Sequence, residues 1–287
     1  MSTVLASSPR IQTSPLDIAA VALDVRDIDA MVEFYREAVG LELLSLTGDR
    51  ALLGAGGVGF LELLHRPDLM PRDPAAAGLY HTAFLLPTRA DLGRWLRHAA
   101  ETGVRLDGAA DHLVSEAVYL HDPEGNGIEI YSDRPATAWD WQGDQVVMAN
   151  DRLDMIGLRA LATERWAGVP AGTRIGHVHL QVGDVGAAER FYAGQLGFAP
   201  TRRWPSALFM STGGYHHHLA TNTWASAGAG PRDPARAGLA SVTLAAANRD
   251  VLNGIAGRLP GADLQTGVRD PWGTLIKLHH HDTGRTP

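Results

Sequence analysis

The chain has 287 residues, 45% hydrophobic and 20% charged, which is ordinary for a globular protein with one large domain or two smaller ones. Its net charge of −7 gives little support for a nucleic-acid partner, and the lack of cysteine excludes disulfides and thiolate metal sites. The start, MSTVLASSPRIQTSPLD, has no secretory pattern, and no apolar run reaches the roughly 20 residues of a membrane span. A cytoplasmic protein without a membrane partner is therefore expected.

Two segments of the chain repeat each other, residues 18–44 (IAAVALDVRDIDAMVEFYREAVGLELL) and residues 175–201 (IGHVHLQVGDVGAAERFYAGQLGFAPT). Identical residues recur at one spacing: Ile18, Val21, Leu23, Val25, Asp27, Phe34, Tyr35 and Gly40 reappear as Ile175, Val178, Leu180, Val182, Asp184, Phe191, Tyr192 and Gly197. In each copy, alternating apolar residues predict a strand, the Asp predicts a helix N-cap, and the Gly predicts the end of that helix.

Short strands are predicted after each helix, over ELLSLTG, RALLG and VGFLELLH in the first copy and over SALFMST and YHHHLATN in the second. Residues 80–103 and 238–261 each predict a strand and a helix. They are followed by the similar stretches LVSEAVYLHDPEGNGIEIYSD and VRDPWGTLIKLHH. The sequence thus predicts an α+β fold of four β-α-β-β-β modules in two halves, with modules one and two in residues 15–133 and modules three and four in residues 174–282.

A connector over residues 134–173 separates the two halves and contains Trp139, Trp141 and Trp166. It is too apolar for a loose linker, so we expect it to pack across the halves. Its tryptophans and the loops of module three are the expected source of residues that select a substrate.

The four modules, the DPEGNGIEIY stretch and the IGHVHL strand resemble the vicinal-oxygen-chelate superfamily of glyoxalases, bleomycin-resistance proteins and extradiol dioxygenases. Within it, the chain is most similar to the two-domain, catechol 2,3-dioxygenase-like branch. The resemblance covers about residues 18–279 and implies curved, barrel-like sheets around a metal cleft.

The resemblance also implies where metal ligands lie, because in such proteins the first and last strands of a module each offer one. The first-strand positions hold Ala20, His81, His177 and Ser241, and the last strands hold Glu62, Glu129, the run His216–His218 and Lys277. A site built from the second half alone is broken, since Ser241 and Lys277 cannot replace a His and a Glu. We therefore expect His81, Glu129 and His177 to form the site between modules two and three. Two histidines and one carboxylate suit non-haem Fe(II), and Mn(II) is the other candidate.

The stretch HHHLA from residue 216 resembles the family's His-His-x-apolar-Ala strand, which implies that His217 handles protons and that His216 lies by the substrate. On a strand, His216 and His218 would face one side and His217 the other, so the three would not serve one site. The resemblance further places Tyr119 where the family has a tyrosine that bonds the substrate oxygen.

The stretch DHLVSEAVYL resembles the family's Asp-His-x-Val-Ser run, which implies that Asp111 and His112 lie near the pocket. His112 is expected to take part in catalysis and Asp111 in substrate binding. His179 shares a strand face with His177 and is expected among the groups around the substrate.

Three functions remain open from the sequence. The first is a non-haem Fe(II) extradiol dioxygenase that cleaves a catechol-type ring with O2, and His217 with Tyr119 favours it. The second is a glyoxalase-like isomerase or lyase with a fourth metal ligand from residues 216–218. The third is a metal-free binding or resistance protein. The resemblance is also compatible with a homo-oligomer.

Overall fold

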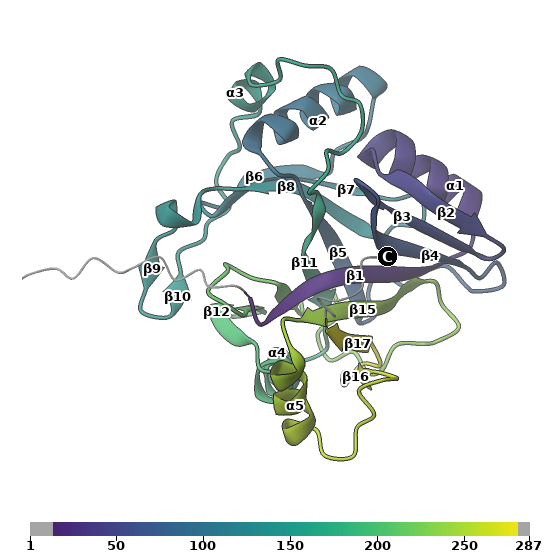
Figure 1. Cartoon of the computed structure of the whole chain (residues 1–287), viewed down its shortest axis with the longest axis vertical. Coiled ribbons are helices and arrows are strands. Elements are labelled where there is room, and N and C mark those ends of the chain that lie inside the picture. The colour runs from purple at the N-terminus through teal and green to yellow at the C-terminus, as the bar shows by residue number, and fades with distance from the viewer. Residues whose placement is uncertain (1–13, 281–287) are drawn as a thin grey trace, which may run out of the picture.

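Two curved β-sheets form the centre of the computed structural model, which describes residues 14–280 (Figure 1). The seven-stranded sheet contains, in spatial order, β16 (Val268–Arg269), β17 (Leu275–His280), β15 (Gly238–Ala246), β1 (Leu16–Val25), β4 (Val58–His65), β3 (Arg50–Ala55) and β2 (Glu42–Thr47). The eight-stranded sheet contains β12 (Ala199–Trp204), β13 (Ala207–Ser211), β14 (Leu219–Asn222), β11 (Arg174–Gln181), β5 (Gly78–Leu85), β8 (Gly127–Asp133), β7 (Ser115–His121) and β6 (Gly108–Asp111).

The helices lie on the outside of these sheets (Figure 1). They are α1 (Ile28–Phe34), α2 (Arg89–Thr102), α3 (Met155–Ala160), α4 (Val185–Glu189) and α5 (Arg249–Arg258), with π-helical turns η1 (Tyr35–Val39) and η3 (Arg190–Gln195) and the 3₁₀ turn η2 (Ala136–Ala138). In the connector, β9 (Trp141–Gln142) and β10 (Gln145–Val146) form a separate hairpin.

The modules share sheets in a way that their order in the chain does not suggest. Antiparallel pairing of β1 with β15 joins module one to module four, and antiparallel pairing of β5 with β11 joins module two to module three. The predicted α+β fold of repeated modules is confirmed. Strands from modules two and three therefore lie side by side in the eight-stranded sheet.

The repeated helices begin as the sequence predicted. The side chain of Asp27 accepts a hydrogen bond from the Ala30 amide at 3.0 Å, and the side chain of Asp184 accepts one from Ala187 at 2.6 Å. The first helix passes into a π-helical turn and ends at Gly40, whose φ of +93° is a left-handed conformation that favours glycine.

Each repeated tyrosine holds the turn of the following module. The Tyr35 hydroxyl donates to Asp122 Oδ2 at 3.0 Å, and the Tyr192 hydroxyl donates to Asp270 Oδ2 at 2.8 Å. The other oxygen of each aspartate accepts two backbone N–H groups of its own turn at 2.8–3.0 Å. The tyrosine and the DP-x-G turn thus recur together because they bond to each other.

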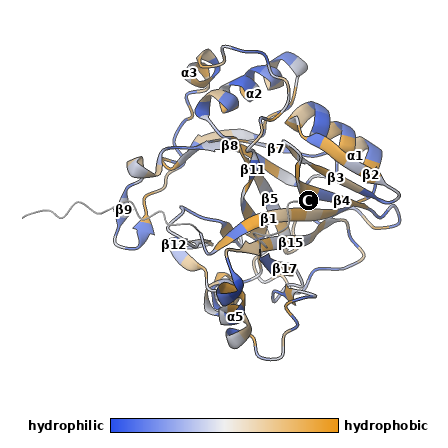
Figure 2. Ribbon diagram, in the orientation of Figure 1, coloured by the Kyte–Doolittle hydropathy of each residue, from blue (hydrophilic) through white to orange (hydrophobic). Residues whose placement is uncertain are grey.

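The core lies between the sheets and the helices. Apolar residues of both sheets, such as Val21, Leu61, Ile130 and Val178, belong to one continuous buried cluster. Figure 2 shows much hydrophobic colour along the inner strands and both hydrophobic and hydrophilic colour on the outer helices. This arrangement follows the strand and helix periodicities of the sequence.

The strand predicted over residues 215–222 is wrong in its first half, because β14 begins only at Leu219. Gly213 and Gly214, with φ of +65° and +80°, turn the chain after β13. The run His216–His218 then follows as an irregular bend. Strand alternation therefore does not decide where these three side chains point, and their individual partners do.

The connector packs against both halves, as predicted. Trp139 Nε1 donates to the carbonyl oxygen of Val114 at 3.1 Å, and the Trp139 ring lies 5.0 Å from that of His216. Trp166 stacks on His98 with 5.8 Å between ring centroids.

The domain boundaries predicted near residues 133 and 174 stay a prediction. Residues 1–13, which carry most of the stretch judged to lack a secretory pattern, and residues 281–282 of the second predicted domain lie outside the described residues. Within residues 14–280, no helix is long and apolar enough to cross a membrane.

Candidate metal centre

Three strands of the eight-stranded sheet bring His81, Glu129 and His177 together. The middle strand, β5, places Ala83 opposite His177 of β11 and beside Glu129 of β8. His81 precedes Ala83 by two residues, so both side chains leave the same face of the sheet. Because Ala83 has only a methyl group, the side chains on either side of it can converge.

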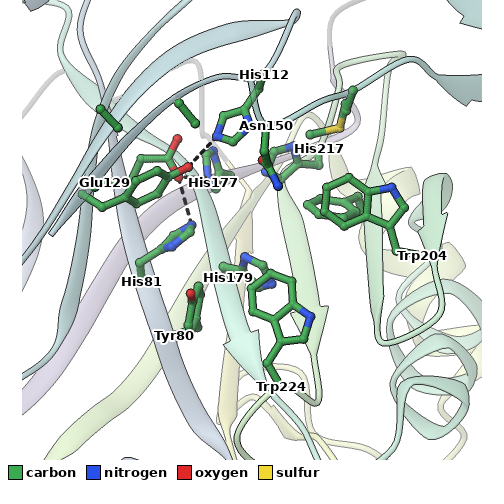
Figure 3. Close-up of a pocket in the computed structure, with 16 residues that line it drawn as sticks. Tyr80, His81, His112, Glu129, Asn150, His177, His179, Trp204, His217 and Trp224 are labelled. Atoms are coloured by element: carbon green, nitrogen blue, oxygen red, sulfur yellow. Dashed lines mark hydrogen bonds and ion pairs between the residues drawn. The ribbon is translucent and has the colours of Figure 1, made fainter. Parts of the chain in front are cut away.

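The potential ligand atoms meet at one carboxylate oxygen (Figure 3). Glu129 Oε2 lies 3.0 Å from His81 Nε2 and 3.1 Å from His177 Nε2. All three side chains are buried. Among residues 14–280, they are the group of His, Asp or Glu side chains whose ligand atoms all lie within 4.8 Å of one another.

Burial and mutual contact set the protonation of this group. Burial by itself would raise the pKa of Glu129, but the imidazoles of His177 and His81 outweigh it and hold that pKa well below its usual value. Burial lowers the pKa of His177 to about 4, against the opposing effect of Glu129. At neutral pH, Glu129 is therefore a carboxylate and His177 a neutral imidazole, which are the forms that bind metals.

These residues fit a divalent metal. His81 Nε2 is buried and lies 3.0 Å from Glu129 Oε2, but this contact lacks hydrogen-bond geometry. A metal would give this nitrogen the partner that a buried polar atom needs. Ligand atoms that share a metal at roughly 2.0–2.2 Å lie roughly 3 Å apart, which matches the distances from Glu129 Oε2 to the two imidazole nitrogens. Two imidazoles and one carboxylate also leave coordination positions open on Fe(II).

The seven-stranded sheet offers no similar group among its described residues. Its first-strand positions hold Ala20 and the buried Ser241. Glu62 instead pairs with Arg50 at 2.5 Å, and Lys277 is exposed. The arrangement of strands is repeated in the two sheets, but the ligand chemistry is present in one of them.

A cavity of about 340 Å³ opens beside the three candidate ligands. His112, Tyr119 and His217 line its polar side, and Trp204 and Trp224 form part of an apolar side. Figure 3 shows the two tryptophans across the cavity from the candidate ligands. A flat aromatic molecule with polar groups on one edge matches this division.

Some cavity residues were not predicted. Tyr80 lies on β5 next to His81, and Met148 and Asn150 come from the connector, yet no sequence motif marks any of them. Within the described lining, the connector tryptophans that we expected are absent. Trp204 and Trp224 belong to module three, where the sequence did indicate substrate-facing residues.

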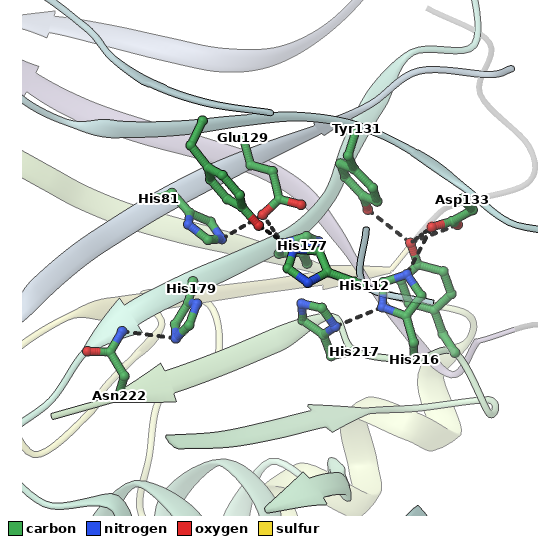
Figure 4. A network of polar contacts seen from close by, with 12 residues as sticks. His81, His112, Glu129, Tyr131, Asp133, His177, His179, His216, His217 and Asn222 are labelled. Carbon is green, nitrogen blue, oxygen red and sulfur yellow. Dashed lines mark hydrogen bonds and ion pairs between the residues drawn. The ribbon is translucent and has the colours of Figure 1, made fainter. Parts of the chain in front are cut away.

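His217 lies at the cavity beside His177, with 4.1 Å between their ring centroids. Its Nδ1 is 2.7 Å from Nδ1 of His216, and His216 Nε2 is 2.9 Å from Asp133 Oδ1 (Figure 4). Burial first, and then the neighbouring His177 and His216, lower the pKa of His217 well below its usual value. His217 is therefore a neutral imidazole that can accept a proton.

Tyr119 of β7 pairs directly with Glu129 of β8. The Tyr119 hydroxyl lies 2.5 Å from His112 Nε2, while His112 Nδ1 lies 2.9 Å from the carbonyl oxygen of Ala149. A carbonyl only accepts, so His112 Nδ1 donates to it and His112 Nε2 accepts from the Tyr119 hydroxyl. Burial, and next Glu129, raise the pKa of Tyr119 well above its usual value, so the phenol keeps its proton.

Of the three residues expected around the substrate, one lines the cavity. His179 lines it, and His179 Nε2 accepts a hydrogen bond from Asn222 at 3.0 Å. Asp111 does not line it, because its Oδ2 accepts from Arg134 at 2.6 Å. His216 does not line it either and lies behind His217, fully buried.

The repeated β-α-β-β-β modules and the candidate metal centre between them indicate the class of protein to which the chain belongs. The family model described as "Glyoxalase/Bleomycin resistance protein/Dioxygenase superfamily" matches residues 17–130 and 174–252. The chain belongs to this superfamily, and the predicted family is confirmed.

Known proteins are similar to the chain at different levels. The Catechol-2,3-dioxygenase of Bacillus subtilis (strain 168) is 39% identical over 253 residues, which are 85% of this chain and 88% of that protein. The Biphenyl-2,3-diol 1,2-dioxygenase 3 of Rhodococcus globerulus is 30% identical over 132 residues, which are 42% of this chain and 65% of that protein. The structure of glyoxalase I from Zea mays covers 92% of each chain with a TM-score of 0.53 at 14% identity, which shows a shared fold.

Proposed function

We propose that the chain is a non-haem Fe(II)-dependent extradiol dioxygenase, which opens a catechol-type aromatic ring with both atoms of O2. The observation that carries this proposal is the convergence of His81, Glu129 and His177 beside a cavity that also holds His217 and Tyr119. The 39% identical relative, named for the same kind of reaction, supports it.

His81, Glu129 and His177 would hold the metal. When bound, the metal supplies a Lewis-acid and redox centre at which the diol and O2 come together. The Glu129 carboxylate would offset one positive charge of a divalent ion inside a buried site. The two imidazoles, which carry no charge as ligands, would leave the other charge for a deprotonated diol oxygen.

The remaining cavity residues have separate tasks. His217 takes a proton from a diol hydroxyl and returns it when the O–O bond is cleaved, so that both oxygen atoms stay in the product. When the diol binds, the Tyr119 hydroxyl turns its one O–H from His112 Nε2 to the substrate oxygen and stabilises negative charge there. Trp204 and Trp224 pack against the ring and exclude water from it.

The two alternative functions find less support. A glyoxalase-like site would take a fourth ligand from the run His216–His218, whereas within residues 14–280 the group of close ligand atoms contains none of these histidines. A metal-free binding protein would not need two imidazole nitrogens aimed at one buried carboxylate oxygen, at 3.0 Å and 3.1 Å.

The test is to load the protein anaerobically with Fe(II), add catechol and admit air. Oxygen uptake equal to the catechol consumed, together with a yellow ring-opened product, is the expected result. Metal bound in equal molar amount without oxygen uptake, across catechol and its aryl-substituted forms, would contradict the proposed reaction. The His217→Gln variant is expected to bind iron and to turn over about 10²-fold or more slowly, since it lacks the general base.

A further inference from the structure

Behind the cavity, a line of hydrogen bonds runs from His217 to the side chain of Asp133. His217 Nδ1 contacts His216 Nδ1 at 2.7 Å, and His216 Nε2 contacts Asp133 Oδ1 at 2.9 Å (Figure 4). Asp133 also accepts from the Tyr215 hydroxyl, at 2.9 Å to Oδ2. His216 has no exposed surface and does not line the cavity, so both of its ring nitrogens serve this line.

The direction of these hydrogen bonds follows from the end of the line. A carboxylate has no proton to give, so Asp133 requires an N–H at Nε2 of His216. A neutral His216 then has a lone pair at Nδ1, and this nitrogen can only accept. The proton between the two histidines therefore belongs to Nδ1 of His217. The second nitrogen of a neutral His217, Nε2, is left with a lone pair.

The surroundings fix His216 in the orientation that this line needs. Its ring packs against two aromatic rings, with centroid distances of 4.0 Å to Tyr215 and 5.0 Å to Trp139, and these two rings also contact each other. Its backbone carbonyl accepts from the Thr201 hydroxyl at 2.5 Å. Trp139 is itself held, because its Nε1 donates to two backbone carbonyls. A ring flip of His216 would break the contacts at both of its nitrogens.

We propose that Asp133 and His216 are positioning residues that hold His217 as the tautomer protonated on Nδ1, with the Nε2 lone pair directed to the cavity. The catalytic consequence rests on the proposed function, in which His217 must begin as a base. The opposite tautomer would present an N–H to the diol and could not accept its proton. A carboxylate that fixes an imidazole tautomer in this way acts as the buried Asp of a serine-protease triad does, here through one additional histidine.

The tautomer is measured directly by ¹⁵N NMR of the full chain labelled at its histidines and loaded with diamagnetic Zn(II). Nitrogens with and without a proton have well-separated ¹⁵N shifts, and the His217 signals are assigned from their loss in His217→Gln. We expect a protonated Nδ1 and an unprotonated Nε2 in the native protein. An Nε2 proton on His217 in the native protein overturns the inference, whether or not the protein cleaves catechol.

Two variants test the positioning residues. His216→Phe keeps a ring packed against Trp139 and Tyr215 but removes the acceptor of the His217 proton, so the Nε2–H tautomer should gain population. Asp133→Asn allows an amide N–H to face His216 Nε2 and should shift His217 in the same direction. In the iron-loaded enzyme, both variants should lower kcat by about 10²-fold or more, with little change in KM.

The matched control is Asp17→Asn, since Asp17 Oδ1 contacts Nε2 of His218, the next histidine in the run, at 3.1 Å. It should leave the His217 tautomer and kcat unchanged. An unchanged tautomer in both His216→Phe and Asp133→Asn overturns the positioning role. A native Nδ1–H that is lost in these variants supports it even if catechol is not cleaved, because that result counts against the proposed reaction alone.

Discussion

His177 and Glu129 lie on strands that do not pair with each other, yet His177 Nε2 is 3.1 Å from Glu129 Oε2. The strand between them contributes Ala83, which pairs with both residues and is fully buried. A methyl group at this position lets the two longer side chains meet above it. The candidate metal centre thus depends on a small residue that binds nothing.

Substitution of Ala83 by valine should therefore weaken metal binding. The added methyl groups lie where the side chains of His177 and Glu129 approach, and we expect the Kd for Fe(II) or Zn(II) to rise at least tenfold. The control is Ala22→Val, because Ala22 has the equivalent place beside Glu62 and opposite Ser241 in the other sheet. Both variants should lose about 1–3 kcal/mol of unfolding free energy by overpacking. Equal metal affinity in the two variants would show that the space above Ala83 is not needed.

The metal-free protein should lose stability in mild acid. Burial lowers the pKa of His177 to about 4 and holds the pKa of His217 well below its usual value. An unfolded histidine titrates near pH ~6.5, so between this pH and about 4 the unfolded chain binds protons that the folded chain excludes. The stabilisation is complete above pH ~6.5 and falls with pH; His177 alone accounts for about 2 kcal/mol of loss by pH 5.

Thermal unfolding of the metal-free protein at pH 8 and pH 5 measures this effect. The melting temperature should be lower at pH 5, and the difference should shrink in His177→Gln. A melting temperature that is the same at both pH values would mean that these histidines are not buried as neutral groups.

Loss of the Tyr35 hydroxyl should destabilise the fold without removing the metal centre. Tyr35 donates to the buried Asp122, whose other partners remain in place. Tyr35→Phe should lower the free energy of unfolding by about 1–3 kcal/mol, as expected for a buried acceptor that loses one partner. Denaturant unfolding measures the change, and iron binding by the folded variant should be unaltered. A neutral effect would show that the tyrosine–turn bond does not join the modules energetically.

Tyr119→Phe should have the opposite profile. Tyr119 lies at the cavity beside Glu129, and its hydroxyl donates to His112. Removal of a donor that stabilises charge in the transition state should lower kcat by about 10²-fold or more. Steady-state oxygen uptake gives kcat. The control is Tyr192→Phe, which removes a hydroxyl that bonds to the turn at Asp270 and does not line the cavity. A Tyr119→Phe enzyme with native kcat would remove the phenol from the mechanism.

Much of the fold could be predicted because the chain repeats itself. The recurrence of Asp27 and Tyr35 as Asp184 and Tyr192 predicted two equivalent strand–helix units, and both aspartates cap helices. The partnership of modules one and four and of modules two and three was not visible, because it depends on strand pairing between distant segments. In contrast, the presence of His81, Glu129 and His177 at the ligand positions of modules two and three did indicate which modules meet at the candidate site.

The details of the site were harder to predict. The pattern YHHHLATN has the composition of a strand, but its first half is an irregular bend. The left-handed Gly213 and Gly214 turn the chain just before it, and its histidines have separate partners. Met148 and Asn150 reach the cavity from an irregular connector, for which no periodicity predicts a direction. Trp139, expected near the substrate, instead packs against His216.

The central claim is that His81, Glu129 and His177 hold the catalytic metal between two modules. Its most direct test compares the native protein with His177→Ala. Iron content and catechol-dependent oxygen uptake are measured on both after anaerobic Fe(II) loading, with His121→Ala, whose exposed side chain pairs with Asp107, as control. We predict about one iron per native chain and per control chain, as one three-residue site requires, and loss of both iron and oxygen uptake in His177→Ala. Native iron content and native oxygen uptake in His177→Ala would contradict the account.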